Sequence, residues 1–152
     1  MKSLSFSLRL LALVALVFTG CEKITEDDQS AAVATVRANL EAMRTGNAEA
    51  IAGTVHPSSP HFEATKAFAQ QQAARYTLLY DLQSAQFDGV KDGAIRVRFV
   101  QETRRLLGPD DLKDNRVTGW HLLRRDGEKW KLWGTEVEKT EELGPATPAP
   151  AP

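Results

Sequence analysis

Hydrophobic and polar positions follow a helical period in the first half of the chain and a two-residue period in the second half. From Ser30 onward, apolar side chains recur every three or four residues, which predicts an amphipathic helix that ends at Gly46. Two further helices are predicted, each preceded by a capping residue: residues 48–54 after Asn47, and residues 60–76 after Ser59. The chain therefore begins its fold with three consecutive helices.

Alternating polarity starts near Leu78 and indicates strands that bury one face. The pattern predicts strands over residues 78–87 and 95–105, joined by a turn at 88–93. Residues 115–137 form a hairpin whose turn carries Gly127, and all three tryptophans lie in it. We expect an α+β domain in which the three helices pack on one face of a bent, mainly antiparallel four-stranded sheet.

Polar residues continue the apolar inner face of the second predicted strand and suggest a ligand pocket. Gln101 and Thr103 follow Phe99 on that face, and His121 occupies the matching face of the next strand. Tyr76 ends the third helix beside them. These four residues are the predicted pocket lining. Histidine transfers protons near neutral pH, but a single strand histidine is more often structural, so no catalytic residue is assigned.

The first twenty residues have the pattern of a secretory signal peptide. Lys2 and Arg9 precede an apolar run at residues 10–18, and small residues stand directly before Cys21. Cleavage is predicted between Gly20 and Cys21. The organisation that follows is a signal peptide over residues 1–20, a solvated tether over 21–29, a folded domain over 30–140 and a disordered Pro/Ala-rich tail over 141–152.

Composition removes several classes of function. The 19 Lys and Arg balance 20 Asp and Glu, so the chain lacks the basic excess that binds nucleic acid. His56 and His61 flank two prolines at a spacing that fits no zinc motif, and each is predicted to make a hydrogen bond at a helix end. No phosphate loop, serine elbow or cofactor motif is visible. We expect no metal and no cofactor.

Several segments resemble the nuclear transport factor 2-like (NTF2-like) superfamily, and more narrowly a bacterial branch of it. The resemblance covers residues 30–138 and rests on these segments: Gly46–Ala50, His56–Pro60, Tyr80–Leu82, Ile95–Arg104, Asp114–Val117 and Trp130–Leu132. It implies a cone with a pocket between sheet and helices. The superfamily includes isomerases, dehydratases and non-catalytic binding modules, so the resemblance does not select an activity.

Residues 17–21 resemble the lipobox of bacterial lipoproteins, with Phe18 where that family usually has leucine. The resemblance implies cleavage before Cys21 and acylation of that cysteine, which would anchor the protein in the lipid bilayer. Glu22 follows the cysteine, which favours the outer membrane by the sorting rule of enteric bacteria. We therefore expect a lipoprotein of the bacterial cell envelope that faces the periplasm.

Three functions remain open. The first is a non-catalytic module that binds a small apolar ligand, or a protein partner or second copy of the chain through the sheet face. The second is an isomerase- or hydrolase-like enzyme with a pocket around His121, and the third is a structural spacer. An enzyme predicts a closed cavity where His121 and an acid converge, a binding module predicts an apolar cavity without that convergence, and a spacer predicts a filled interior.

Overall fold

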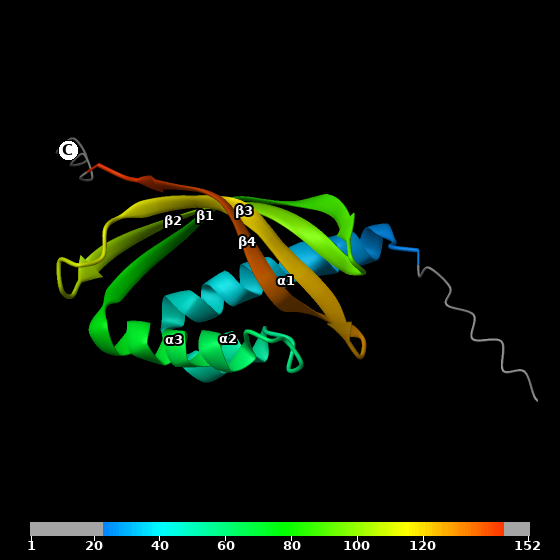
Figure 1. Ribbon diagram of the computed structural model, residues 1–152, viewed down its shortest axis with the longest axis horizontal. Helices are drawn as coiled ribbons and strands as arrows, with labels where there is room; N and C mark the ends of the chain where they lie inside the picture. Colours follow the sequence, from blue (N-terminus) through cyan, green and yellow to red (C-terminus); the bar gives the residue numbers. More distant parts are fainter. Residues whose placement is uncertain (1–22, 145–152) are drawn as a thin grey trace, which may run out of the picture.

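Three helices cover one face of a strongly bent sheet in the computed structural model, which describes residues 23–144 (Figure 1). The antiparallel strands follow the order β1-β2-β3-β4, so each strand pairs with its neighbour in the chain. This confirms the predicted α+β cone. The elements are α1 (Glu26–Thr45), α2 (Ala48–Gly53), α3 (Phe62–Arg75), β1 (Thr77–Lys91), β2 (Ala94–Leu107), β3 (Asn115–Asp126) and β4 (Lys129–Glu142).

The first helix begins earlier than the sequence pattern predicts. Thr25 is the N-cap: its hydroxyl accepts from the Asp28 N–H at 3.2 Å, while the Asp28 carboxylate accepts from the Thr25 N–H at 3.0 Å. The predicted cap at Ser30 is therefore wrong, because Ser30 lies inside α1. Residues 26–29, predicted as solvated tether, are helical. The predicted cleavage at Gly20 and Cys21 lies outside the described residues.

The Asp28 carboxylate also ties the start of α1 to the β3–β4 hairpin. It forms an ion pair with Arg125, and the indole N–H of Trp130 lies 3.3 Å from Oδ1. The hydrogen bonds from Thr25 hold the pKa of Asp28 below its usual value. A residue predicted to be solvated is buried because it completes both a helix cap and a contact between distant segments.

Other predicted boundaries shift by a few residues. Helix α3 starts at Phe62 because Ser59 instead donates to the carbonyl of Trp133 at 2.7 Å. Strand β1 continues through the predicted turn at 88–93 by an irregular register, which leaves only Asp92 and Gly93 to reverse the chain. Strand β4 extends to Glu142, so the first two residues of the predicted tail are ordered.

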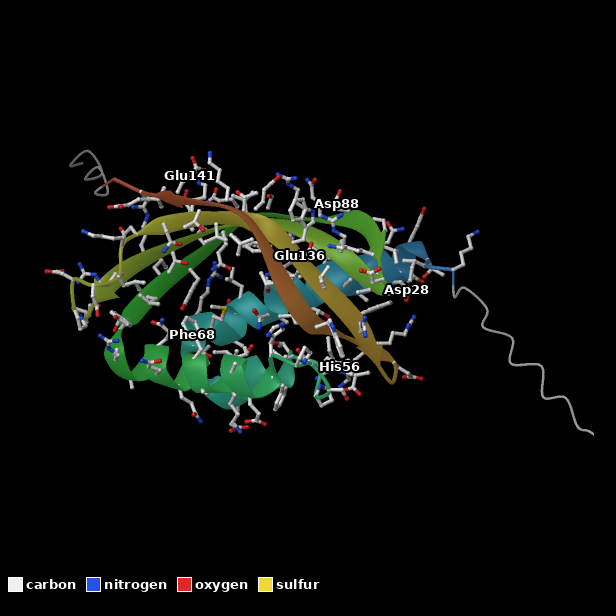
Figure 2. The ribbon with its side chains drawn as sticks, in the orientation of Figure 1. Asp28, His56, Phe68, Asp88, Glu136 and Glu141 are labelled. Atoms are coloured by element: carbon white, nitrogen blue, oxygen red, sulfur yellow. The ribbon has the colours of Figure 1, made fainter. Side chains whose placement is uncertain are left out.

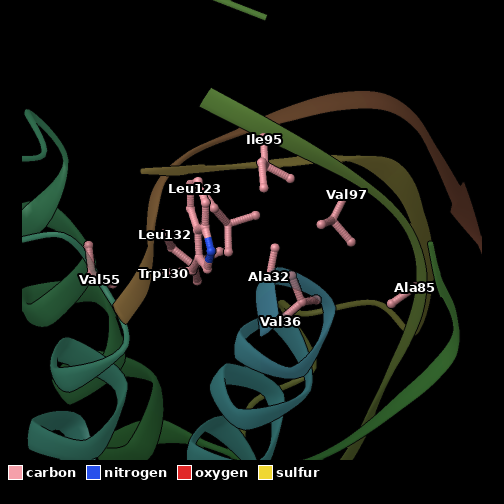
Figure 3. Packing of buried hydrophobic residues seen from close by; sticks show 9 residues of the cluster. All are labelled: Ala32, Val36, Val55, Ala85, Ile95, Val97, Leu123, Trp130 and Leu132. Carbon is pink, nitrogen blue, oxygen red and sulfur yellow. The ribbon is translucent and has the colours of Figure 1, made fainter. Parts of the chain in front are cut away.

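A compact apolar core fills the half of the cone that contains the N-terminal part of α1 (Figure 3). Ile95 and Val97 of β2 and Leu123 of β3 have no exposed surface, and they face Ala32 and Val36 of α1. Burial of such side chains is the main stabilising contribution to folding. The alternation along β2 that predicted this inner face is therefore confirmed.

The outer face of the sheet carries charged side chains that pair across strands. Arg98 contacts Glu138 at 2.6 Å, and Arg116 contacts Glu102 at 2.6 Å. The Trp120 indole N–H donates to Asp88 at 2.5 Å. Figure 2 shows Asp88, Glu136 and Glu141 on this side, away from the helices. The outer face is therefore polar in its described part.

Candidate functional site

A cavity of about 800 Å³ lies between the helices and the inner face of the sheet. The C-terminal half of α1, α2 and α3 form one wall, and the inner positions of all four strands form the other. Apolar side chains predominate in the lining. Phe68 of α3 lies between that helix and the sheet (Figure 2), and 53% of its surface is exposed because it borders the cavity. The half of the cone opposite the packed core is therefore hollow.

His121 stands in the strand wall of this cavity as an uncharged imidazole. Its ring stacks on Phe99 with 4.2 Å between centroids, and Nδ1 lies 2.9 Å from the hydroxyl oxygen of Thr135. Loss of solvent around the ring lowers the pKa of His121 to about 4. No second hydrogen bond of this ring is found within residues 23–144, so Nε2 is available to a ligand.

Two of the other predicted pocket residues line the cavity and one does not. Gln101 faces the cavity and donates from Nε2 to the Thr103 hydroxyl at 3.3 Å. Thr103 is buried and does not line the cavity, so its contact with Gln101 is what connects it to the site. Tyr76 lines the cavity, but its hydroxyl donates to Asp111 at 2.6 Å, which raises the pKa of Tyr76. Tyr76 thus offers a ligand its ring more than its hydroxyl.

Several polar residues of the cavity were not predicted as pocket lining, among them Tyr80 and Gln72. Tyr80 is buried on β1, and burial raises the pKa of its hydroxyl. Gln72 of α3 lines the cavity, and its Oε1 is buried without a hydrogen-bond partner in the described chain. Gln72 lies three residues after Ala69 and four before Tyr76, so the helical stripe that predicted α3 could have identified it.

The histidines beside the two prolines have different surroundings. His56 accepts from the Ser58 N–H at 3.1 Å through Nδ1, and its Nε2 lies 3.1 Å from the Arg125 carbonyl oxygen. The predicted helix-end hydrogen bond of His61 is wrong, because His61 is the N-cap of α3 without a side-chain cap and instead lines the cavity. Within residues 23–144, no cluster of His, Cys, Asp and Glu is able to hold a metal ion.

No aspartate or glutamate lines the cavity within the described residues. Asp81 of β1 and Glu102 of β2 are carboxylates of the strands that border the cavity, but neither lines it. Asp81 lies 4.0 Å from the Arg44 guanidinium of α1, and Glu102 pairs with Arg116. The arginine hydrogen bond lowers the pKa of Glu102 and keeps it ionised. A carboxylate base beside His121 is therefore missing, and the polar groups of the cavity suit hydrogen bonding to a neutral ligand.

Comparison with solved structures defines the class to which this cone and pocket belong. Over 72% of this chain and 93% of the other, the fold matches an NTF2-like protein from Streptomyces avermitilis assigned as a dehydratase (TM-score 0.58, 19% identity). A ketosteroid isomerase-like protein from Erwinia carotovora atroseptica matches over 80% of this chain and 100% of its own (TM-score 0.55, 14% identity). The fold is NTF2-like, a class that includes both enzymes and binding modules.

The NTF2-like architecture also occurs in a subunit of a larger enzyme. The beta subunit of benzoate 1,2-dioxygenase from Burkholderia mallei matches over 76% of this chain and 91% of its own (TM-score 0.53, 9% identity). Identities this low establish the fold alone.

A family model places the chain more narrowly. Residues 34–143 match the C-terminal domain of anti-sigma-I factor RsgI9, and the chain belongs to this family. The match begins within α1 and ends after β4, so it covers nearly the entire described fold. No curated protein sequence matches the chain. Among the described helices, none is long and apolar enough to cross a membrane.

Proposed function

We propose that this chain is a lipoprotein of the bacterial cell envelope whose NTF2-like domain binds a small, neutral, mainly apolar molecule without chemically changing it. The cavity of about 800 Å³, with apolar walls and no lining carboxylate in the described chain, is the observation on which this proposal rests. A structural spacer has no use for such a cavity. A protein partner on the outer sheet face is less well supported, because that face is occupied by ion pairs.

The polar groups of the cavity support a neutral ligand. His121 is uncharged at neutral pH, Tyr80 contributes an uncharged hydroxyl to the same strand wall, and Gln72 contributes an uncharged amide from the helix wall. Each of them is suited to bind a hydroxyl or carbonyl group, which would fix one end of an otherwise apolar molecule. An anion would leave its charge uncompensated beside these residues. The one arginine of the lining, Arg44, already donates to the Tyr80 carbonyl at 2.9 Å.

The sequence and the family name support the remaining parts of the proposal. Anchoring rests on the lipobox-like segment around Cys21, with outer-membrane placement from Glu22. The family model is named after an anti-sigma-I factor and not after an enzyme, and this supports binding over catalysis. Incorporation of a labelled fatty acid into the full-length protein, and its loss in Cys21→Ser, is the expected result of metabolic labelling in a bacterial host.

Ligand binding is tested with N-phenyl-1-naphthylamine, a neutral apolar probe that fluoresces in apolar surroundings. Ala69→Phe places a ring into the cavity, and Ala74→Phe adds the same ring on α3 away from it. We expect the wild type and Ala74→Phe to bind the probe equally, and Ala69→Phe to bind at least tenfold more weakly, about 1.4 kcal/mol. Equal binding by all three proteins would contradict a site in the cavity.

A second candidate function is turnover by His121, which the location of this residue in the cavity favours. Its imidazole and the Tyr80 hydroxyl are both suited to polarise a carbonyl group. Conversion of a 3-keto steroid or another enolisable ketone by the wild type, lost in His121→Ala with folding intact, would establish an isomerase-like activity. The absence of a lining carboxylate in the described chain is the reason that we rank it second.

A further inference from the structure

The start of α1 leaves a very short connection between the predicted lipid anchor and the folded domain. Ile24 packs against the apolar core, and Thr25 caps the helix directly after it. Cys21 stands three residues before Ile24 in the sequence. A fully extended chain spans at most about 3.6 Å per residue, so this connection reaches only about 11 Å.

The helix start is held firmly at its position in the fold. The Asp28 carboxylate accepts from both the N–H and the hydroxyl of Thr25, and it pairs with Arg125 at the end of β3. These contacts join the first turn of α1 to the hairpin, so the connection cannot be lengthened by fraying of the helix without breaking them.

The same end of the molecule carries both hairpin turns. Arg124, near the end of β3, donates to the carbonyl of Asp92 in the β1–β2 turn at 3.2 Å. Figure 1 shows the first turn of α1, the β1–β2 turn and the β3–β4 turn together at one end, with the C-terminal end of β4 at the other. We call the first end the anchor pole. The cavity starts beside the packed core, at Val55 and Leu132, and extends away from the anchor pole to Met43 and Gly46 at the end of α1.

We propose that the anchor pole rests on the phospholipid surface, so that the hollow half of the cone points away from the membrane. This inference rests on the anchoring of Cys21 in the proposed function. The 20 residues of α1 span about 30 Å, which separates the cavity end from the pole. A solvated tether, as the sequence predicts, would leave the orientation free, whereas a connection of about 11 Å does not.

The short connection, and not surface charge, is the cause of this orientation. Acidic and basic side chains are mixed at the pole: Lys91, Asp92, Asp126, Glu128 and Lys129. A mixed surface gives little net attraction to anionic lipid. The orientation should therefore persist at high salt, which screens exposed charges.

Fluorescence quenching in vesicles tests the orientation. Full-length protein is produced in a lipoprotein-processing bacterium and reconstituted into phosphatidylethanolamine and phosphatidylglycerol vesicles that contain a lipid with a nitroxide on its headgroup. A fluorophore is attached at Glu128→Cys, in the β3–β4 turn, or at Lys113→Cys, in the loop at the opposite end of β3. We expect the label at residue 128 to be quenched several-fold more strongly, at both low and high salt.

A lengthened connection is the matched control. A Gly/Ser insertion of about 20 residues between Lys23 and Ile24 has a root-mean-square length of about 25 Å and should remove most of the difference between the two labels. Vesicle flotation separates the two levels of the proposal. Protein that does not float overturns the anchoring itself. Three results overturn only the orientation in protein that floats. The two labels are quenched equally, the difference between them disappears at high salt, or the insertion leaves the difference unchanged.

Discussion

The two halves of the cone are built from the same strands, but one half is packed and the other is hollow. In the packed half, which adjoins the anchor pole, the inner positions of the strands hold Ile95, Val97 and Leu123, which are fully buried against α1. Farther along the same two strands, Gln101 and Val117 line a cavity, and His121, which pairs with Val97, stands where the two halves meet. One inner surface therefore supplies stability where it packs on the start of α1 and borders a cavity where it faces α3.

Substitutions of leucine should show the largest difference between the halves. Leu123→Ala removes a side chain with no exposed surface and leaves a cavity in packed surroundings, so we expect a loss of about 3 to 4 kcal/mol in the free energy of unfolding. Leu78→Ala removes a half-buried side chain that already borders open space, and we expect a loss of about 1 kcal/mol. Urea denaturation measures both, and equal losses would contradict a packed half and a hollow half.

Acid should destabilise the hollow half through His121. The folded protein keeps the pKa of this residue at about 4, below the ordinary value of 6.5, so the unfolded state binds a proton first as the pH falls. The contribution of neutral His121 to the free energy of unfolding is complete above pH 6.5. It is lost as the pH falls toward 4, which lowers the free energy of unfolding by up to about 3 kcal/mol.

The matched variant for this pH dependence is His121→Gln, which cannot titrate. We expect the unfolding free energies of wild type and variant to converge, or their difference to reverse, between pH 6.5 and 4. A constant difference over this range would show that His121 is not shielded from solvent in the cavity wall. Carboxylates with a lowered pKa, such as Asp111, lose their contribution to protein stability at lower pH, and this affects wild type and variant equally.

A smaller effect distinguishes the observed start of α1 from the predicted one. Thr25→Ala removes the side-chain cap and should cost about 1 kcal/mol, whereas Ser30→Ala, on the exposed side of α1, should leave the stability unchanged. Thermal unfolding monitored by circular dichroism measures both. A larger loss for Ser30→Ala would restore the helix start that the sequence pattern predicts.

The sequence predicted the fold well because its signals are local and repeated. Alternation along β2 identified the inner face, Gly46 and Asn47 marked the ends of adjoining helices, and Gly127 marked the hairpin. Each of these depends on neighbouring residues and backbone conformation, which a sequence pattern records directly. The predicted face of Gln101 and His121 was therefore correct as well.

Features that depend on distant contacts were missed. The acidic residues 26–28 suggest a solvated tether, but they form the first turn of α1. The sequence pattern misses this because the pairing of Asp28 with Arg125 joins positions far apart in the chain. The size of the predicted pocket could not be inferred, since it depends on how far α3 stands from the sheet. Strand alternation predicts Thr103 in the pocket lining, but Thr103 is buried outside the lining and accepts a hydrogen bond from Gln101.

The most direct test of the account follows the amide signals of the protein by NMR during titration with N-phenyl-1-naphthylamine. We expect signals of Gln72, Val117 and Thr135 in the hollow half to shift, while those of Ala32, Ile95 and Leu123 in the packed half stay in place. Shifts confined to the outer sheet face around Arg98 and Trp120, or no shifts at all, would contradict a ligand-binding cavity.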